Sequence, residues 1–188
     1  PMHAKLLLSP NFQNVVFSNA GLSNTNGNIV TEYDASVDRT YYQWSTAEAT
    51  TQSKNIIVFC QVPEKYAGWS NYKFSCYVSG TASINIAIFD TNNNQLVSQL
   101  VETPGWSDVV ATPANLAALN NGTWTGEKFK IIFTMNAAGA GNVRISDVLL
   151  EYARGTDEMT QVDATVVNNL YTAIVIAQFE ESGTLSTP

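Results

Sequence analysis

The segment Tyr72-Lys73-Phe74-Ser75-Cys76-Tyr77-Val78-Ser79 decides the fold class, because its side chains alternate with the two-residue period of a β-strand. Tyr72, Phe74, Cys76 and Val78 share one face of that strand. Residues 83–89 repeat the alternation, and residues 55–62 have the apolar length and β-branching of a buried strand. Between residues 83–89 and a returning strand at 95–101, the run from Asp90 to Asn94 predicts a turn.

Further strand candidates lie on both sides of this centre. Residues 128–134 and 143–152 are expected to form a late hairpin joined by the small-residue loop 136–141, with a β-bulge near Ser146 and Asp147. Weaker strand candidates are residues 12–17, 28–33 and 39–45.

One short helix is expected, with Thr112 as its N-cap, Pro113 at its first position and residues 114–119 as its body. Many short strands with a single helix predict an all-β fold, namely an antiparallel β-sandwich of jelly-roll type. We assign this sandwich to residues 1–154.

Residues 155–188 are predicted to form an acidic, partly apolar C-terminal arm, which has five acids and no base. The apolar residues of this arm recur at helical spacing, whereas its many Thr, Val and Ile residues favour a strand. Helix and strand therefore both remain open for residues 157–179. The arm is expected to pack against a neighbour in an assembly. The apolar residues expected at that interface are Val166, Leu170, Ile174 and Ile176.

Composition excludes several classes of partner. The net charge is −7 and no basic cluster is present, so binding to a nucleic-acid backbone is not expected. No apolar run has the roughly 20 residues that span a bilayer, and the first residues do not resemble a secretory signal. Synthesis in the cytoplasm is therefore expected.

The two cysteines, Cys60 and Cys76, fall on the predicted core faces of successive strands. A symmetric hairpin turning at residues 67–69 would place them opposite each other. Buried thiols are favoured, and a cross-strand disulfide stays open as the alternative.

Catalytic groups are scarce. His3 is the only histidine, which argues against a Ser-His-Asp triad or a histidine-rich zinc site. Glu32, Asp34 and Asp38 are the weak candidates for a glycosidase-type carboxylate pair. We therefore expect a non-enzymatic protein without a cofactor.

One turn could hold a hard cation. Asp90, Asn92 and Asn94 offer oxygen ligands at alternate positions of the predicted turn, as calcium accepts. The run lacks the glycine and the distal glutamate of an EF-hand loop, so these residues are weak metal candidates and a solvated turn is favoured.

Aromatic residues leave the choice of partner open. In residues 41–44, Tyr42 and Trp44 share one face and Tyr41 lies on the other. Exposed rings on a β-sandwich can stack on sugars or anchor a protein interface, whereas buried rings belong to the core. The candidate glycan-binding residues are Trp44, Trp69, Trp106 and Trp124.

The order of several segments resembles a group of tailed-bacteriophage virion proteins. The resemblance is carried by residues 41–46 (YYQWST), 56–69 (IIVFCQVPEKYAGW), 86–91 (IAIFDT) and 143–148 (VRISDV). It implies a small jelly-roll capsid decoration or cement protein in the virion, bound to the major capsid protein or other virion proteins. Trimers and crossing terminal arms are common in such proteins, so a homo-oligomer, with a trimer favoured, is expected.

The resemblance brings no catalytic residues. The alternative to capsid decoration is a carbohydrate-binding or receptor-binding β-sandwich module that uses exposed aromatic side chains.

Overall fold

The computed structural model describes residues 2–8, 15–18 and 28–155. The β-sandwich unit runs from His3 to Arg154. The strands are β1 (Met2–Leu8), β2 (Val15–Ser18), β3 (Asn28–Asp34), β4 (Arg39–Thr46), β5 (Gln52–Gln61), β6 (Tyr66–Phe89), β7 (Gln95–Val101), β8 (Gly105–Val110) and β9 (Lys128–Arg154), and the helix is α1 (Pro113–Asn120). The proposed interface residues of the arm, Val166, Leu170, Ile174 and Ile176, lie outside the described residues.

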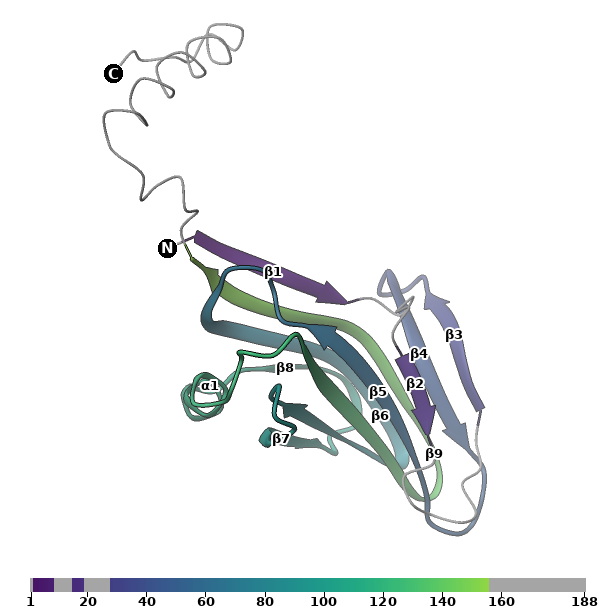
Figure 1. Ribbon diagram of the computed structural model, residues 1–188. Coiled ribbons are helices and arrows are strands. Elements are labelled where there is room, and N and C mark those ends of the chain that lie inside the picture. Colours follow the sequence, from purple (N-terminus) through teal and green to yellow (C-terminus); the bar gives the residue numbers. More distant parts are fainter. Residues whose placement is uncertain (1, 9–14, 19–27, 156–188) are drawn as a thin grey trace, which may run out of the picture. The chain divides into compact units, whose positions relative to one another are not determined.

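Two long strands, β6 and β9, run antiparallel along their full length and connect the two layers of the fold (Figure 1). Their hydrogen-bonded neighbours change halfway along. Residues 82–89 of β6 and 128–137 of β9 belong to a first sheet in the order β2-β5-β9-β6-β7. Residues 66–80 of β6 and 141–154 of β9 belong to a second sheet in the order β3-β4-β9-β6-β8. Strand β1 also pairs with β9.

The two sheets pack face to face. Phe74 of the second sheet meets Phe133 of the first edge-on, with 6.0 Å between ring centroids. The hydroxyl of Tyr72 donates to Oε1 of Gln99 on β7 across the same interface, at 2.7 Å. Tyr72, Phe74, Phe133 and the aliphatic residues around them are buried, so burial of apolar area stabilises the interface. The predicted all-β class and antiparallel sandwich are confirmed.

Both long strands bend where they pass from one sheet to the other. Gly80 has a φ of 65°, and the register between β6 and β9 shifts between Gly80 and Ala82. A Cβ at Gly80 would lie 2.4 Å from the carbonyl oxygen of Ala140. Glycine at this position therefore allows both the left-handed backbone and the close approach of the two strands.

The predicted late hairpin is wrong. Residues 136–141 do not reverse the chain, because β9 continues through them from Lys128 to Arg154. Their small side chains serve the bend instead: Gly141 approaches Ala82 and Ser79 so closely that a Cβ would clash. The predicted bulge near Ser146 is confirmed, since Phe74 pairs with Val148 whereas Cys76 pairs with Ile145.

The predicted pairing of the two cysteine strands is also wrong. Strand β5 pairs with β2 and β9, so Cys60 lies opposite Phe129 in the first sheet, while Cys76 lies in the second. Both cysteines are free and buried, as favoured. Burial raises the pKa of each thiol to about 12, which keeps both protonated and unreactive at neutral pH.

The predicted helix is confirmed as α1. Thr112 is its N-cap and accepts a hydrogen bond from the backbone N–H of Asn115 at 3.1 Å. Leu119 is its buried residue, and the side chain of Asn115 donates to the hydroxyl of Tyr72, so the helix is held against β6. Neither α1 nor any other part of the described chain forms a helix long and apolar enough to cross a membrane.

Candidate functional site

Two of the four candidate tryptophans lie in the core. Trp44 is completely buried, and Trp69 is 4% exposed. Neither can present a ring face to a sugar, so the prediction is wrong for these two residues. The reason is strand alternation: β4 turns Trp44 inward together with Tyr42, and β6 turns Trp69 against Phe129 of the other sheet.

Trp106 lies on the outer face of the second sheet. It pairs with Tyr77, which pairs in turn with Arg144, and Arg144 pairs with Gln43, so one row crosses β8, β6, β9 and β4. The chain neighbours of Tyr77 and Arg144, such as Cys76 and Val143, are buried in the core. Because successive side chains point to opposite faces, the row points away from the core.

Side chains from both flanks of the outer face of the second sheet meet over its middle. Tyr41 on β4 and Trp106 on β8 are separated by two strands, roughly 14 Å at the usual strand spacing of about 4.8 Å. Their ring centroids are nevertheless only 6.0 Å apart, and the guanidinium of Arg39 lies 4.7 Å from the Trp106 ring. The side chains therefore lean toward each other, and Tyr41 is buried among its neighbours.

Arg144 lies in the middle of this face and contacts neighbours on several sides. Its guanidinium lies 4.8 Å from the ring of Tyr41 and 4.5 Å from that of Tyr77, which are cation–π distances. Its Nε donates to Oε1 of Gln43 at 2.8 Å, and Nη1 lies 3.7 Å from a carboxylate oxygen of Asp34. The Arg144 side chain is still 23% exposed, so it is both fixed in place and accessible from solvent.

Two carboxylates on this face are held in the ionised form. The hydrogen bonds from Ser36 lower the pKa of Asp34, and Arg144 contributes a smaller part. The hydroxyl of Ser75 donates to Asp108 at 2.7 Å and lowers the pKa of that carboxyl, with help from Lys73 at 3.3 Å. We call the outward side chains of this face the sheet-face cluster: Arg39, Tyr41, Gln43, Tyr77, Trp106 and Arg144, with Glu32, Asp34, Lys73 and Asp108 around them.

The hydrolase candidates Glu32, Asp34 and Asp38 each have a separate hydrogen-bond partner. Glu32 accepts from the hydroxyl of Tyr41 at 3.1 Å, and Asp38 accepts from that of Tyr33 at 2.6 Å. Asp34 has a lowered pKa, whereas a general acid for glycoside hydrolysis needs a raised one. This geometry gives no support to the hydrolase reading.

The candidate calcium ligand Asp90 is occupied by N–H donors. Its carboxylate accepts from the backbone N–H groups of Asn92 at 2.9 Å, Asn94 at 2.8 Å and Thr123 at 3.0 Å. Burial alone would raise the pKa of Asp90, but these hydrogen bonds outweigh it and the pKa is lowered. Since N–H donors surround the oxygen atoms, Asp90, Asn92 and Asn94 are not arranged as a cation site. Within residues 28–155, no group of three or more His, Cys, Asp or Glu side chains is placed to hold a metal.

Asp90 instead ties the turn after β6 to the loop after α1, so replacing it with alanine should destabilise the sandwich. We expect Asp90→Ala to lower the free energy of unfolding by about 1–3 kcal/mol, because buried N–H groups lose their acceptor. The control is Asn92→Ala, an exposed neighbour, and chemical denaturation measures both.

The Asp90 effect should also depend on pH. A lowered folded-state pKa contributes stability above the unfolded value of about 3.9 and loses it as pH falls through the folded value. The difference between the wild type and Asp90→Ala should therefore shrink below about pH 4. A difference that is constant down to pH 2 would contradict this account.

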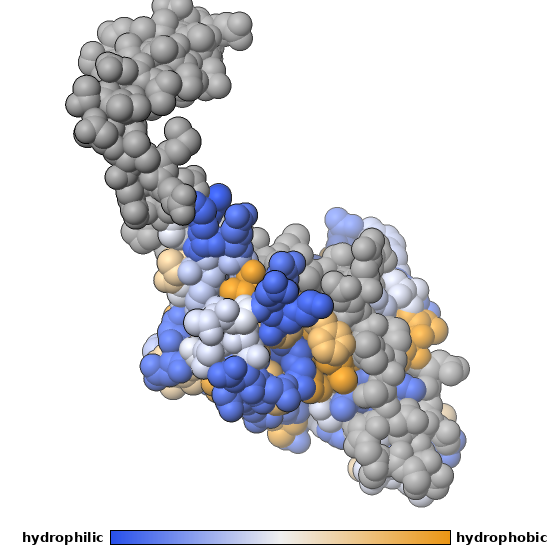
Figure 2. Space-filling model, viewed as in Figure 1, coloured by the Kyte–Doolittle hydropathy of each residue, from blue (hydrophilic) through white to orange (hydrophobic). Residues whose placement is uncertain are grey.

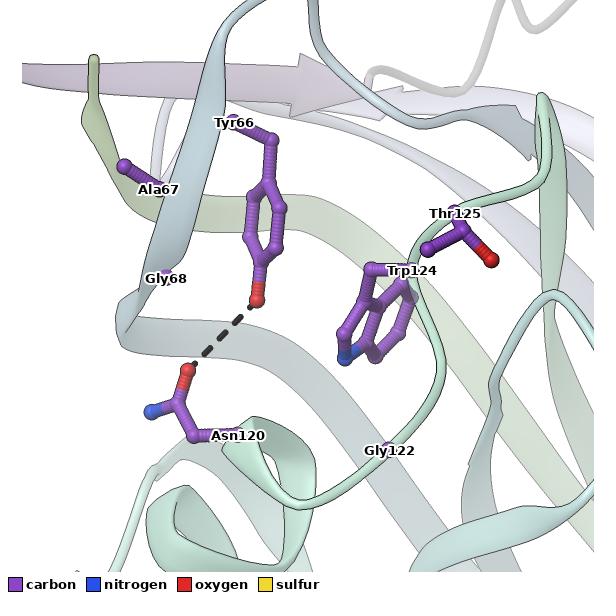
Figure 3. Close-up of a pocket in the computed structure, with 7 residues that line it drawn as sticks. All are labelled: Tyr66, Ala67, Gly68, Asn120, Gly122, Trp124 and Thr125. Atoms are coloured by element: carbon purple, nitrogen blue, oxygen red, sulfur yellow. Dashed lines mark hydrogen bonds between the residues drawn. The ribbon is translucent and has the colours of Figure 1, made fainter.

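Trp124 lies at one end of the sandwich in an open pocket of about 490 Å³ (Figure 3). The start of β6 contributes Tyr66, the end of α1 contributes Asn120, and the following loop contributes Trp124 and Thr125. Tyr66 and Trp124 are half-buried, with their ring centroids 5.9 Å apart. On the side of the molecule seen in Figure 2, hydrophobic residues form only small patches among hydrophilic ones.

The sequence missed most of the sheet-face cluster. Its pattern does not single out Arg39, Tyr77 or Arg144, because they lie on three different strands that no sequence spacing relates. One signal was present: Tyr77 and Arg144 occupy outward positions of otherwise alternating strands, where a small polar residue would suffice. Large rings and guanidinium groups at such positions indicate a surface that contacts something.

No protein-family model matches the sequence, and no curated protein matches it. Solved structures with a similar fold include the carbohydrate-binding module TmCBM61 in complex with β-1,4-galactotriose, with a TM-score of 0.52 and 18% identity over 77% of this chain and 90% of that one. The enzymatically active domain of bacteriophage CBA120 tailspike protein 4 has a TM-score of 0.53 and 14% identity, over 76% of this chain but only 20% of its own length.

At such low identity these likenesses concern the backbone and not the ligand. They show that the chain has the antiparallel β-sandwich fold found in a carbohydrate-binding module and in part of a phage tailspike domain.

Proposed function

We propose that this chain is a non-enzymatic carbohydrate-binding module, and that it binds a glycan chain across the outer face of the second sheet. The observation that carries the proposal is the sheet-face cluster, in which Trp106, Tyr77 and the fixed guanidinium of Arg144 meet on that face. A folded core has no need of these groups on its outward face.

The chemistry of the cluster matches that of a sugar. A pyranose has apolar C–H faces that stack on aromatic rings, and a hydroxyl rim that both donates and accepts hydrogen bonds. Trp106 and Tyr77 supply ring surface, and Arg39 and Arg144 supply donors. The carboxylates of Asp34 and Asp108 stay ionised and supply acceptors.

Charge on this face favours a neutral glycan. The positive groups are Arg39, Lys73 and Arg144, and the negative groups are Glu32, Asp34 and Asp108, so the formal charges cancel. An anionic polymer would gain little net attraction from such a surface, whereas neutral hydroxyl groups can use both signs.

The structural comparisons support the proposal at the level of the fold. TmCBM61 carries β-1,4-galactotriose on a sandwich of the same kind. The likeness to a domain of a phage tailspike, together with the sequence resemblance to virion proteins, supports a receptor-binding role for the module on a virus particle.

Glycan arrays and affinity electrophoresis in polysaccharide gels test the proposed function. We expect binding to one or more neutral glycans, with longer oligosaccharides bound more tightly than short ones because the face crosses several strands. An absence of binding to plant, bacterial-capsule and lipopolysaccharide O-antigen glycans alike would overturn the proposal.

Capsid decoration is the second candidate, and it rests on the sequence resemblance and the apolar arm. A decoration protein would bind particles through contacts with the major capsid protein. Unchanged particle binding by a chain cut after Arg154, or a monomeric mass in solution, would count against it.

A further inference from the structure

The pocket between Tyr66 and Trp124 is distant from the sheet-face cluster. On β6, Gly68 of the pocket is nine residues from Tyr77, roughly 30 Å along a strand, and five residues, roughly 16 Å, from Lys73 at the edge of the cluster. A ligand on the outer face of the second sheet would therefore not fill the pocket, and the two surfaces need separate explanations.

The aromatic wall of the pocket is rigid. The indole Nε1 of Trp124 donates to the carbonyl oxygen of Leu119 at 2.8 Å, which fixes the ring plane. Trp69 and Phe129 contact Trp124 edge-on, with centroids 5.1 Å and 5.2 Å away. Gly122 lies close to the end of the Leu96 side chain, so the loop that carries Trp124 packs against β7.

Asn120 supports the pocket but has no hydrogen-bonding capacity left for a ligand. Its Oδ1 accepts from the backbone N–H of Trp69 at 2.8 Å, and its Nδ2 donates to the carbonyl oxygens of Trp69 and Leu116. The remaining contact of Oδ1, with the Tyr66 hydroxyl, is long at 3.5 Å (Figure 3). The Tyr66 hydroxyl can therefore exchange this contact for a bond to a ligand. Thr125 is exposed and follows Trp124 in the loop.

The residues that line the pocket favour a neutral ligand. They are Tyr66, Ala67, Gly68, Asn120, Gly122, Trp124 and Thr125, and none of them is ionised at neutral pH. Burial raises the pKa of Tyr66 to about 12, so its hydroxyl stays neutral and can donate. An aromatic surface with neutral hydroxyl groups suits a sugar better than an anion or a cation.

The ring geometry limits how a sugar can bind. A sugar held between two rings needs about twice the usual contact distance of roughly 3.5–4.0 Å, or about 7–8 Å between rings. Tyr66 and Trp124 are 5.9 Å apart at 50°, which is too close. A sugar ring can therefore stack only on the open side of the aromatic wall.

We propose that this pocket is a second carbohydrate site, which takes a single neutral sugar ring stacked on the aromatic wall formed by Trp124 and Tyr66. This inference extends the proposed function to a separate surface. Its ligand is one residue, such as the end or a branch of a glycan, whereas the outer face of the second sheet takes a stretch of chain.

The test is NMR titration of the full chain with methyl glycosides of glucose, galactose, mannose, N-acetylglucosamine and N-acetylgalactosamine. In a Trp106→Ala background, at least one glycoside should still shift the indole N–H signal of Trp124 at millimolar concentrations. Tyr66→Phe should weaken that binding several-fold, and Trp124→Ala at least tenfold. Leu100→Ala, an exposed residue on β7, is the control that should leave it unchanged.

The outcomes separate the two sites. Polysaccharide binding by the wild type without any glycoside-induced shift at Trp124 would overturn the second site and leave the proposed function standing. Shifts at Trp124 without any polysaccharide binding would overturn the proposal that the sheet-face cluster binds a glycan chain. The proposed sugar site in the pocket would stand. Since Trp124→Ala also removes packing against Phe129, the wild-type shifts and Tyr66→Phe decide the result if that variant does not fold.

Discussion

Trp106→Ala should weaken binding of the preferred glycan by about 30-fold or more, equivalent to roughly 2 kcal/mol, the threshold for an aromatic hot spot. Trp106 contributes ring surface on β8 and is the partner of Arg39, whose guanidinium lies 4.7 Å from the ring. Its removal takes away the stacking surface and also frees Arg39. Isothermal titration calorimetry with the tightest-binding oligosaccharide measures the change.

Leu100→Ala is the control for this experiment. Leu100 lies on β7 in the first sheet, outside the sheet-face cluster, and is 56% exposed. It should bind glycan as the wild type does. Equal affinity of the Trp106 and Leu100 variants would place the glycan elsewhere.

The sequence predicted much of the sandwich because its strands alternate strongly. Residues 72–79 and 83–89 show the alternation of a half-buried strand, and the predicted turn from Asp90 to Asn94 follows them. The helix was predictable because Thr112 and Pro113 provide local signals that need no tertiary information. Local chemistry sufficed for these elements.

Pairing between strands was not predictable in the same way. Nothing within residues 55–79 shows that β5 pairs with β9, about 80 residues later, rather than with the adjacent β6. Short connections favour pairing between consecutive strands, and that preference produced the wrong cysteine hairpin. The glycines and alanines of residues 136–141 indicated a loop, but they serve a close approach between two continuous strands.

The candidate site was predictable only in part for the same reason. Residue type identified Trp106 and Trp124 as candidates, and equally Trp44 and Trp69, which are buried. Exposure of a ring depends on strand parity and on what the opposite sheet covers. Arg144 gains its importance from Tyr41, Gln43 and Tyr77 on neighbouring strands, so only the register reveals it.

Gly80→Ala should have the largest effect on folding, and the reason lies in how the two sheets share their strands. Gly80 has a φ of 65°, and an added Cβ would lie 2.4 Å from the carbonyl oxygen of Ala140 and 3.0 Å from the Cα of Gly141. Left-handed strain and a backbone clash each cost about 1–3 kcal/mol, so we expect a loss of about 3 kcal/mol or more in the free energy of unfolding.

Gly139→Ala controls for this substitution within the same bend. A Cβ at Gly139 would meet only the side chain of Thr81, at 3.7 Å and 3.8 Å, which is ordinary contact, so its stability should stay within about 0.5 kcal/mol of the wild type. Urea denaturation followed by tryptophan fluorescence compares the two. Since β6 and β9 both pass from one sheet to the other here, a strained bend should loosen both layers together. If Gly80→Ala were as stable as Gly139→Ala, the stability of the sandwich would not depend on the close approach of β6 and β9 at the bend.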